Sequence, residues 1–414
     1  MALRPRIAVA VGVCVLLGGG VVFGRWYELN HARPSQIAEK QAVVHVTNTG
    51  DRGPGTLREA LFIAAAAPGP VNISIEVPQI EVQSALPALV NGHGVRIATT
   101  AGTRIVAHTL GGGPVLDVSG PDTTLEGLTI TDCPAAAILV RATRFRLMTS
   151  NISACDVGVD VAENASQTLL EGNRLSGNRI GVRFAASGHS TSVTNNEFND
   201  QKDAGLWAVR GTADSHDEPI GIHDNKFTEN GIGIVSGNIP TLVERNDFIN
   251  AHEADIHIVG NGAVIRGNRI NGGAAMGIVA ENARGAIIEN NELEGLSAYG
   301  VMVRGSSNVL VRGNRLHNCG YGLAFVLGDT RSASTAADNT IIEPKFNGID
   351  VVGDSPILRR NQVLRPHAYA LHVEDFQPPA GGPKVHSEPF LDNNSFDKSG
   401  TGVSATAAAP PQRR

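Results

Sequence analysis

Residues 291–316 read NELEGLSAYGVMVRGSSNVLVRGNRL, and this stretch begins and ends on the same motif of Asn, a charged residue and Leu. In a looser form, Asn followed by one polar and one apolar residue, the motif returns in its strongest copies every 21 to 29 residues. A nearly constant period indicates one structural unit stacked on itself many times. The strongest copies begin at Asn173, Asn196, Asn225, Asn246, Asn268, Asn291 and Asn314, and weaker copies follow at Asn339, Asn361 and Asn394.

A second motif lies between successive Asn motifs. It is a Gly followed by alternating apolar residues, as in Gly158-Val159-Asp160-Val161 and Gly300-Val301-Met302-Val303. Alternation with period two predicts a short strand with one buried face. A third apolar segment precedes each Asn, so each repeat holds about three short strands and leaves no room for a helix. The leucine-rich repeat has a similar period, but its leucine-dense consensus is absent.

On these motifs the chain resembles the right-handed parallel β-helix superfamily, the pectin-lyase-like fold, over roughly residues 43–400. The resemblance implies an all-β fold, a single-stranded right-handed parallel β-helix of about 12 coils with an N-terminal capping helix. We expect the Asn column to form a ladder of side-chain hydrogen bonds along a turn. The residues that follow the Asn of the seven strongest copies alternate in charge without exception, which we interpret as structural pairing. They are Arg174, Glu197, Lys226, Asp247, Arg269, Glu292 and Arg315.

The N-terminus predicts a membrane anchor within residues 1–27. Arg4 and Arg6 precede a mostly apolar stretch from Ile7 to Gly24, and Arg25-Trp26-Tyr27 follow it. This pattern favours an uncleaved transmembrane anchor over a cleaved signal peptide. We therefore expect inner-membrane anchoring with the β-helix in the periplasm, or secretion if the segment is cleaved.

The rest of the chain divides into a polar tether (28–42), an N-terminal strand and capping helix (43–70), the β-helix (71–400) and a disordered tail (401–414). The helix is expected from Thr56 through about Ala67, stopped by Pro68-Gly69-Pro70. This part resembles the N-terminal cap of secreted β-helix proteins, which covers the open end of the core.

Charge and cysteine content narrow the choice of partners. A net charge of −6 gives no reason to expect nucleic acid. No set of stacked acids clearly reproduces the calcium site of pectate lyases, so we expect no cofactor.

Cys133 and Cys155 each follow an inward residue by three positions, which brings them within disulfide reach on adjacent coils. The alternative is a pair of small buried thiols. Cys319 should stay unpaired.

The resemblance implies that polysaccharide lies along the face of the Gly-Ile-x-Val strands. We expect substrate binding by Arg183, Trp207, Glu281, Arg304 and His372. Tyr299, Tyr321 and Tyr369 each begin a strand of this face and either stack on sugar rings or pack the turn. The outward positions are Asp160, Arg183, Trp207, Gly233, His257, Val279, Met302, Ala324, Asp350 and His372, and the next outward positions add Arg210, Glu281, Arg304 and Glu374.

Three insertions follow this strand, at 211–219, 328–338 and 375–389, and the first holds a candidate catalytic element. Asp214-Ser215-His216-Asp217 is similar to the Asp-Pro-His-Asp element of mannuronan C5-epimerases, with Ser215 in place of Pro. The resemblance implies that His216 or Asp217 removes the sugar C5 proton while Arg210 neutralises the carboxylate. The alternative is a polar, exposed loop.

His257 is a second candidate base, and an exposed strand histidine is its alternative. Two classes of function therefore remain open. One is a lyase or C5-epimerase acting on an acidic cell-envelope or exopolysaccharide. The other is a non-catalytic β-helix that binds polysaccharide or scaffolds an envelope or export protein complex.

Overall fold

The computed structural model describes residues 42–100, 102–185, 190–210, 218–273, 276–328, 333–379 and 382–397, and the backbone of 403–405. The predicted anchor and tether up to Gln41, and the loop residues His216 and Asp217, lie outside the described residues. Within the described residues, no helix is long and apolar enough to cross a membrane.

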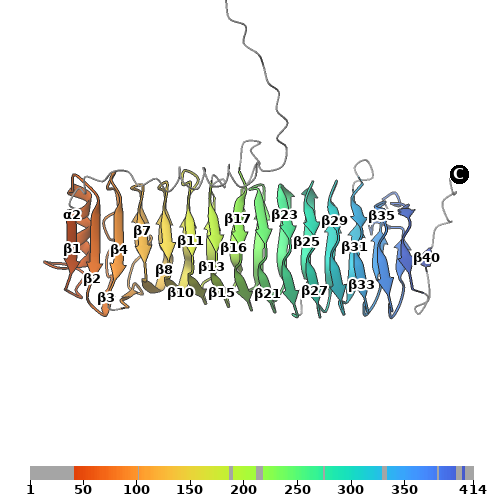
Figure 1. Cartoon of the computed structure of the whole chain (residues 1–414), viewed down its shortest axis with the longest axis horizontal. Helices are drawn as coiled ribbons and strands as arrows, with labels where there is room; N and C mark the ends of the chain where they lie inside the picture. Colours follow the sequence, from red (N-terminus) through yellow and green to blue (C-terminus); the bar gives the residue numbers. More distant parts are fainter. Residues whose placement is uncertain are drawn as a thin grey trace, which may run out of the picture. The chain divides into compact units, whose positions relative to one another are not determined.

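The described chain winds into a right-handed parallel β-helix of about 12 coils, which confirms the predicted fold (Figure 1). One 15-stranded parallel sheet runs along the stack. Its strands, in spatial order, are β1 (Ala42–Val46), β2 (Val71–Ile75), β4 (Val95–Thr99), β7 (Thr124–Glu126), β9 (Arg146–Met148), β11 (Leu169–Glu171), β14 (Ser192–Thr194), β17 (Ile220–His223), β20 (Thr241–Glu244), β23 (Ala263–Arg266), β26 (Ile287–Glu289), β29 (Leu310–Arg312), β32 (Thr335–Ala337), β35 (Ile357–Arg359) and β38 (Phe390–Asp392).

The two remaining strands of each coil come from the two sequence motifs. The strands that follow the Asn motif are β12 (Arg174–Ser176), β15 (Glu197–Asn199), β18 (Lys226–Thr228), β21 (Asp247–Ile249), β24 (Arg269–Asn271), β27 (Glu292–Glu294), β30 (Arg315–His317), β33 (Thr340–Ile342), β36 (Gln362–Leu364) and β39 (Ser395–Phe396). The strands of the Gly motif are β13 (Ile180–Phe184), β16 (Ala204–Val209), β19 (Ile232–Gly237), β22 (Ala254–Asn261), β25 (Met276–Arg284), β28 (Tyr299–Arg304), β31 (Tyr321–Val326), β34 (Ile349–Val352), β37 (Leu371–Glu374) and β40 (Val403–Ala405).

The first coils are less regular. Here β3 (Gln79–Glu81), β5 (Arg104–Val106) and β6 (Leu116–Val118) lead into two long strands, β8 (Thr129–Val140) and β10 (Asn151–Val161). At the other end, β40 lies within the stretch predicted as a disordered tail and pairs with β37. The β-helix therefore extends past residue 400.

Inward apolar residues form continuous columns through the stack. Phe198, Phe227 and Phe248 are fully buried on successive coils, and their rings stack with centroids 4.7 and 4.8 Å apart. This matches the spacing of hydrogen-bonded strands. Burying each such ring contributes about 1.5–3 kcal/mol, so the column is a large part of the stabilisation of each coil.

The predicted Asn ladder is present, and it is buried from Asn173 to Asn361. Asn246 donates from Nδ2 to the Ile222 carbonyl at 2.9 Å and to Oδ1 of Asn268 at 3.0 Å. Its own Oδ1 accepts from the backbone N–H and the side chain of Asn225. Left-handed backbone falls on the residue before each ladder Asn, as at Asn290 (φ 54°). The ladder thus satisfies buried polar groups that the turn would otherwise leave unpaired.

The charge column beside the ladder also has the predicted register. Arg174 pairs with Glu197 at 2.9 Å, and Arg269 with Glu292 at 3.6 Å. All four side chains are more than half exposed. Such exposed pairs contribute little each to stability, but their register matches the structural pairing that the alternation predicted.

The glycine motif has a steric cause. Gly158, Gly181, Gly205, Gly233, Gly277, Gly300, Gly322 and Gly348 form a column in which the next coil passes very close. A Cβ atom on Gly181 would meet the Gly205 carbonyl and lie 2.9 Å from Phe198 Cδ1. The strand register places Asp255 in this column, between Gly233 and Gly277.

Helix α2 (Leu57–Ala66) packs on β1 and β2 at the N-terminal end of the stack. The Thr56 side chain accepts from the Glu59 N–H, and Glu59 accepts from the Gly55 N–H at 2.6 Å, a capping arrangement. Asn91 donates to the Ala64 carbonyl at 2.7 Å and so satisfies the other helix end. The buried face of the helix, Leu57, Ala60, Leu61 and Ala64, joins the core.

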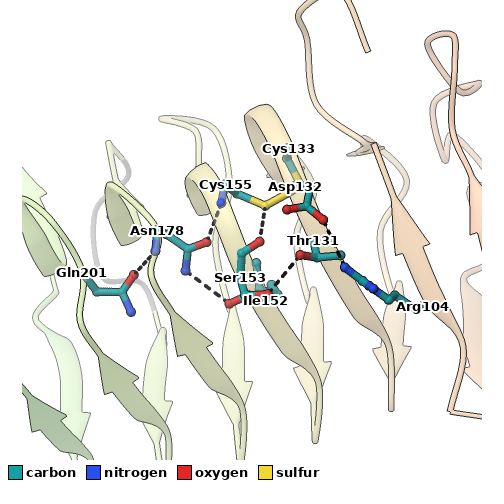
Figure 2. The surroundings of a disulfide bond; sticks show 9 residues. All are labelled: Arg104, Thr131, Asp132, Cys133, Ile152, Ser153, Cys155, Asn178 and Gln201. Atoms are coloured by element: carbon teal, nitrogen blue, oxygen red, sulfur yellow. Dashed lines mark hydrogen bonds and ion pairs between the residues drawn. A yellow bond between two sulfur atoms is a disulfide. The ribbon is translucent and has the colours of Figure 1, made fainter. Parts of the chain in front are cut away.

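Cys133 and Cys155 form a disulfide between adjacent coils, with Cα atoms 4.3 Å apart (Figure 2). The Cys155 N–H donates to Oδ1 of Asn178 at 3.0 Å, and the Asn178 N–H donates to Gln201 at 3.0 Å. A second polar ladder therefore starts at the disulfide. Cys319 is buried and unpaired, as predicted, and burial raises the pKa of its thiol to about 11.

Candidate functional site

The Gly-motif strands present one continuous outward face, here called the candidate face. Parallel pairing places one outward residue from each coil in a single column. One predicted member is wrong: Val235, not Gly233, pairs with Trp207 and His257. Gly233 belongs to the glycine column because the repeat motif in this coil begins at Gly233 and not at Gly231. The observed column is Asp160, Arg183, Trp207, Val235, His257, Val279, Met302, Ala324, Asp350 and His372.

A second outward column lies two residues further along these strands. It contains Val209, Gly237, Val259, Glu281, Arg304, Val326, Val352 and Glu374. Glu281 and Arg304 lie where the sequence placed them. The predicted position of Arg210 is wrong by one residue, because β16 ends at Val209 and Arg210 follows the strand.

The N-terminal part of the candidate face is held together by ion pairs. Arg183 donates from Nε and Nη2 to the two carboxylate oxygens of Asp160, at 2.8 and 2.6 Å. This bidentate bond raises the pKa of Arg183 above its ordinary value. Arg183, predicted to bind substrate, is thus engaged by a neighbour on the adjacent coil.

Of the four predicted catalytic residues, the structure describes Arg210 and His257. Trp207 and His257 share a column but are separated by Val235 on the intervening coil. Arg210 lies beyond the strand end, and His216 and Asp217 lie outside the described residues. His257 instead lies 3.3 Å from Glu281, whose other carboxylate oxygen is 3.5 Å from Arg304.

The C-terminal part of the face holds a different cluster. His372 Nδ1 lies 2.7 Å from Oδ1 of Asp350 on the adjacent coil, and Asn347 donates to the same oxygen at 2.9 Å. Asp350 is buried and His372 is half-buried. A carboxylate that holds one ring nitrogen orients the imidazole and leaves the other nitrogen to face a ligand.

Aromatic rings line the same coils. Tyr299 and Tyr321 stack with centroids 4.8 Å apart, and Phe346 continues the row at 5.1 Å from Tyr321. Tyr369 lies 5.7 Å from the His372 ring. Burial, followed by the nearby Tyr321 and Asp350, raises the pKa of Tyr299. Phe346 remains 49 % exposed, so the row is open to solvent.

We call these six residues the C-terminal aromatic face: Tyr299, Tyr321, Phe346, Asp350, Tyr369 and His372. Sequence reasoning placed His372 and the three tyrosines on the face but missed the pairing with Asp350 and the contribution of Phe346. The sequence contained the information for this pair, since Asp350 and His372 occupy neighbouring positions in the predicted outward column. Phe346 precedes its strand and follows no repeat position. Among the described residues, no three His, Cys, Asp or Glu side chains could together hold a metal ion.

The chain belongs to the family described as right handed beta helix region, which matches residues 82–219 and 212–363. No curated protein sequence matches the chain. Solved structures that share the fold at low identity include the following three. The A-module of an Azotobacter vinelandii mannuronan C-5 epimerase has a TM-score of 0.53 at 14 % identity and covers 86 % of this chain and 94 % of its own.

A glucanase catalytic unit and a tailspike domain also share the fold. The catalytic unit of a Streptomyces thermodiastaticus GH87 α-1,3-glucanase has a TM-score of 0.54 at 14 % identity, over 87 % of this chain and 69 % of its own. The receptor binding domain of the Siphovirus 9NA tailspike has a TM-score of 0.57 at 12 % identity, over 91 % of this chain and 78 % of its own. At such identities the likeness shows the fold alone.

Proposed function

We propose that this protein binds a polysaccharide along the candidate face, with the C-terminal aromatic face as the main contact. The observation that carries the proposal is the open row of Tyr299, Tyr321 and Phe346 beside the hydrogen-bonded Asp350 and His372. Flat apolar rings pack against the faces of sugar rings, and nearby polar groups pair with hydroxyl or carboxylate groups. Successive coils repeat this surface about every 4.8 Å, which suits a linear polymer.

The comparisons support a polymeric ligand. Mannuronan and α-1,3-glucan are named for two structures that share the fold. The first polymer is acidic and the second is neutral, so the fold accommodates both. Arg304 and His372 would attract acidic chains, whereas Glu374 and Glu281 would oppose them. We retain the acidic polysaccharide as the first ligand to test.

Binding is tested with the full-length chain in detergent micelles, by calorimetry or affinity electrophoresis against alginate, pectate and a neutral glucan. We expect at least one polymer to bind and Tyr321→Ala to weaken that binding about tenfold, since a stacked ring contributes on the order of 1–2 kcal/mol. Phe390→Ala is the control, because Phe390 is exposed on the 15-stranded sheet, away from the face. Equal loss in both variants, or no binding to any polymer, would count against the proposal.

A second candidate is lyase or C5-epimerase chemistry, favoured by the His372–Asp350 pair. With Nδ1 held by Asp350, Nε2 of His372 could accept the C5 proton of a uronate residue. Deuterium exchange at C5, or ultraviolet absorbance of unsaturated products, would reveal it, and loss of signal in His372→Ala would assign the base. Loss in His216→Ala or Asp217→Ala, with His372→Ala active, would assign the insertion loop with Arg210 instead.

The cellular setting is also a proposal. The apolar stretch from Ile7 to Gly24 supports an anchor in the inner membrane, and the Cys133–Cys155 disulfide supports an oxidising compartment such as the periplasm. Such a protein would meet polysaccharide during synthesis or export, alone or within an envelope protein complex. Extraction with alkaline carbonate tests the anchor: the chain should stay in the membrane pellet, and release into the supernatant would refute it.

A further inference from the structure

A buried carboxyl group lies where three neighbouring coils meet, just beyond the end of one strand of the candidate face. Asp354 follows β34 by two residues and is 1 % exposed. Its Oδ1 accepts from the Ser355 N–H at 2.6 Å, whereas its Oδ2 is buried and makes no hydrogen bond with a described group. A buried carboxylate oxygen without a donor is costly, and a protonated one is much less so.

The coil before Asp354 is shaped to receive this carboxyl group. Gly328 follows β31 by two residues, and a Cβ atom there would collide with both carboxylate oxygens of Asp354. Only glycine allows the backbone to approach the carboxyl group this closely. Leu327, just before it, adopts left-handed backbone (φ 54°), which turns the chain out of the strand.

The coil after Asp354 is fastened at the same point by Ser387. The Gly353 N–H donates to Ser387 Oγ at 2.7 Å, and Ser387 Oγ donates to the Glu374 carbonyl at 2.6 Å. The Ser387 N–H donates to Asp375 at 2.9 Å. These bonds tie the end of β37 to the chain that returns at residue 387.

On the elements that pack against Asp354, the nearby cationic groups contact Asp375 and not Asp354. Lys384 lies 2.9 Å and His386 lies 3.1 Å from its Oδ2. The bond to Lys384, followed by the Ser387 amide, lowers the pKa of Asp375 to about 2, so this carboxylate stays ionised across the range considered below. Glu374 and Glu388 are exposed. No described cation pairs with Asp354.

We propose that Asp354 is a proton-dependent clamp, which when protonated holds together the ends of β31, β34 and β37 at the border of the candidate face and when ionised loosens them. The clamp rests on the geometry of Gly328, Asp354 and Ser387. Its link to ligand binding rests on the proposed function, because these strand ends border the face.

The pKa of Asp354 lies within the pH range that the test below covers. Burial raises its pKa from 3.8 to about 6, and the amides of Ser355 and Gly328 oppose part of this rise. In an opened state the carboxyl group returns to its ordinary pKa. Opening should therefore become easier as pH rises from about 4 to about 6 and then level off, with a total increase of up to about 100-fold. The clamp is therefore fully closed only at the acidic end of this pH range.

Amide hydrogen exchange by mass spectrometry tests the clamp directly, on the full-length chain in detergent without ligand. After correction for intrinsic exchange, peptides over residues 349–358 and 384–390 should lose protection between pH 4 and pH 7 in the wild type. Asp354→Asn mimics the protonated group and should keep the low-pH protection throughout. Glu163→Gln removes an exposed carboxyl group elsewhere and should behave as the wild type.

A pH-independent wild type, or the same pH response in Asp354→Asn, would overturn the clamp. If Asp354→Asn fails to fold, Gly328→Ala provides a second route: it should loosen the same peptides at pH 4 and abolish the pH response. For a polymer that binds, the wild type should bind more weakly at pH 7 than at pH 4 and Asp354→Asn equally at both. Absence of any binding would refute the proposed function, whereas the exchange result alone decides the clamp.

Discussion

His372 Nδ1 lies 2.7 Å from Asp350 Oδ1, and the two residues are neighbours in one column on adjacent strands. The pair is enclosed on one side by Tyr369 and continues the row that starts at Tyr299 and Tyr321. Many charged pairs elsewhere on the coils join exposed arginines to exposed acids. This pair instead combines a buried carboxylate with a half-buried imidazole among aromatic rings, and it is part of the surface that we propose for ligand binding.

For this pair we predict that His372→Ala lowers polysaccharide affinity about tenfold, since a hydrogen bond to a charged group contributes about 1.5–3 kcal/mol. The measurement is calorimetric titration with the best-binding polymer. His367→Ala is a matched control, because His367 is exposed in the same coil. An unchanged affinity for His372→Ala would show that the pair only supports the coil.

The Asn ladder should be a major source of stability. Asn225→Ala removes donors to the Val193 carbonyl and to Asn246, and leaves Asn196 without its acceptor. All of these groups are buried, so we expect a loss of about 2–4 kcal/mol in unfolding free energy by denaturant titration. Asn151→Ala, at an exposed strand position, should change stability by less than about 0.5 kcal/mol. Equal effects would refute the ladder's role.

Asp255 should be a destabilising residue at neutral pH. It interrupts the glycine column, and neither of its carboxylate oxygens makes a hydrogen bond with a described group. Burial raises its pKa well above 3.8, and the Ala251 amide opposes this only in part. The unfolded chain releases this proton above pH 3.8 while the folded chain retains it, so the penalty grows as pH rises.

Asp255→Gly should therefore stabilise the protein at pH 7 by about 1–3 kcal/mol, and by less at pH 4. Thermal unfolding at the two pH values measures the difference. Asp247→Asn, which changes an exposed acid, corrects for the change in net charge. A variant that is less stable at both pH values would mean that the carboxyl group makes a stabilising contact in the folded chain.

The Cys133–Cys155 disulfide should contribute measurably to the stability of the folded chain. It closes a loop with a sequence separation of 22 residues, for which chain-entropy arguments give about 3 kcal/mol. The Cys133→Ser, Cys155→Ser double variant should unfold at lower denaturant concentration than the wild type, and the reduced wild type should match it. Cys319→Ser is the control. If reduction leaves the transition unchanged, the bond does not form or carries no stabilisation.

Much of the fold could be predicted because one structural rule repeats. The Asn ladder, the Phe198–Phe248 core column and the alternating charges each depend on a neighbour one period away, so the spacing alone reveals them. The predicted pairing of Cys133 with Cys155 followed from the same argument. The predicted register was wrong at Gly233. Gly231 and Gly233 both fit the motif, and only the packing of Gly233 against Phe248 of the next coil shows which of them belongs to the glycine column.

Less of the candidate site could be predicted, since its chemistry departs from the repeat. Phe346 lies outside the repeated positions, and its contact with Tyr321 depends on the path of one turn. The unpaired carboxyl groups of Asp255 and Asp354 are visible only once burial is known. A sequence motif pointed to His216 and Asp217, which lie between β16 and β17 in the sequence, whereas the described contacts gather several coils closer to the C-terminus.

The most direct test of the account is amide exchange with and without the best-binding polysaccharide. We predict that bound polymer protects peptides over residues 297–305, 320–327, 345–353 and 368–375, which carry the C-terminal aromatic face and its border. Peptides of the 15-stranded sheet should be unaffected. Protection confined to the neighbourhood of Trp207 and residues 211–219, or to the 15-stranded sheet, would contradict the placement of the site.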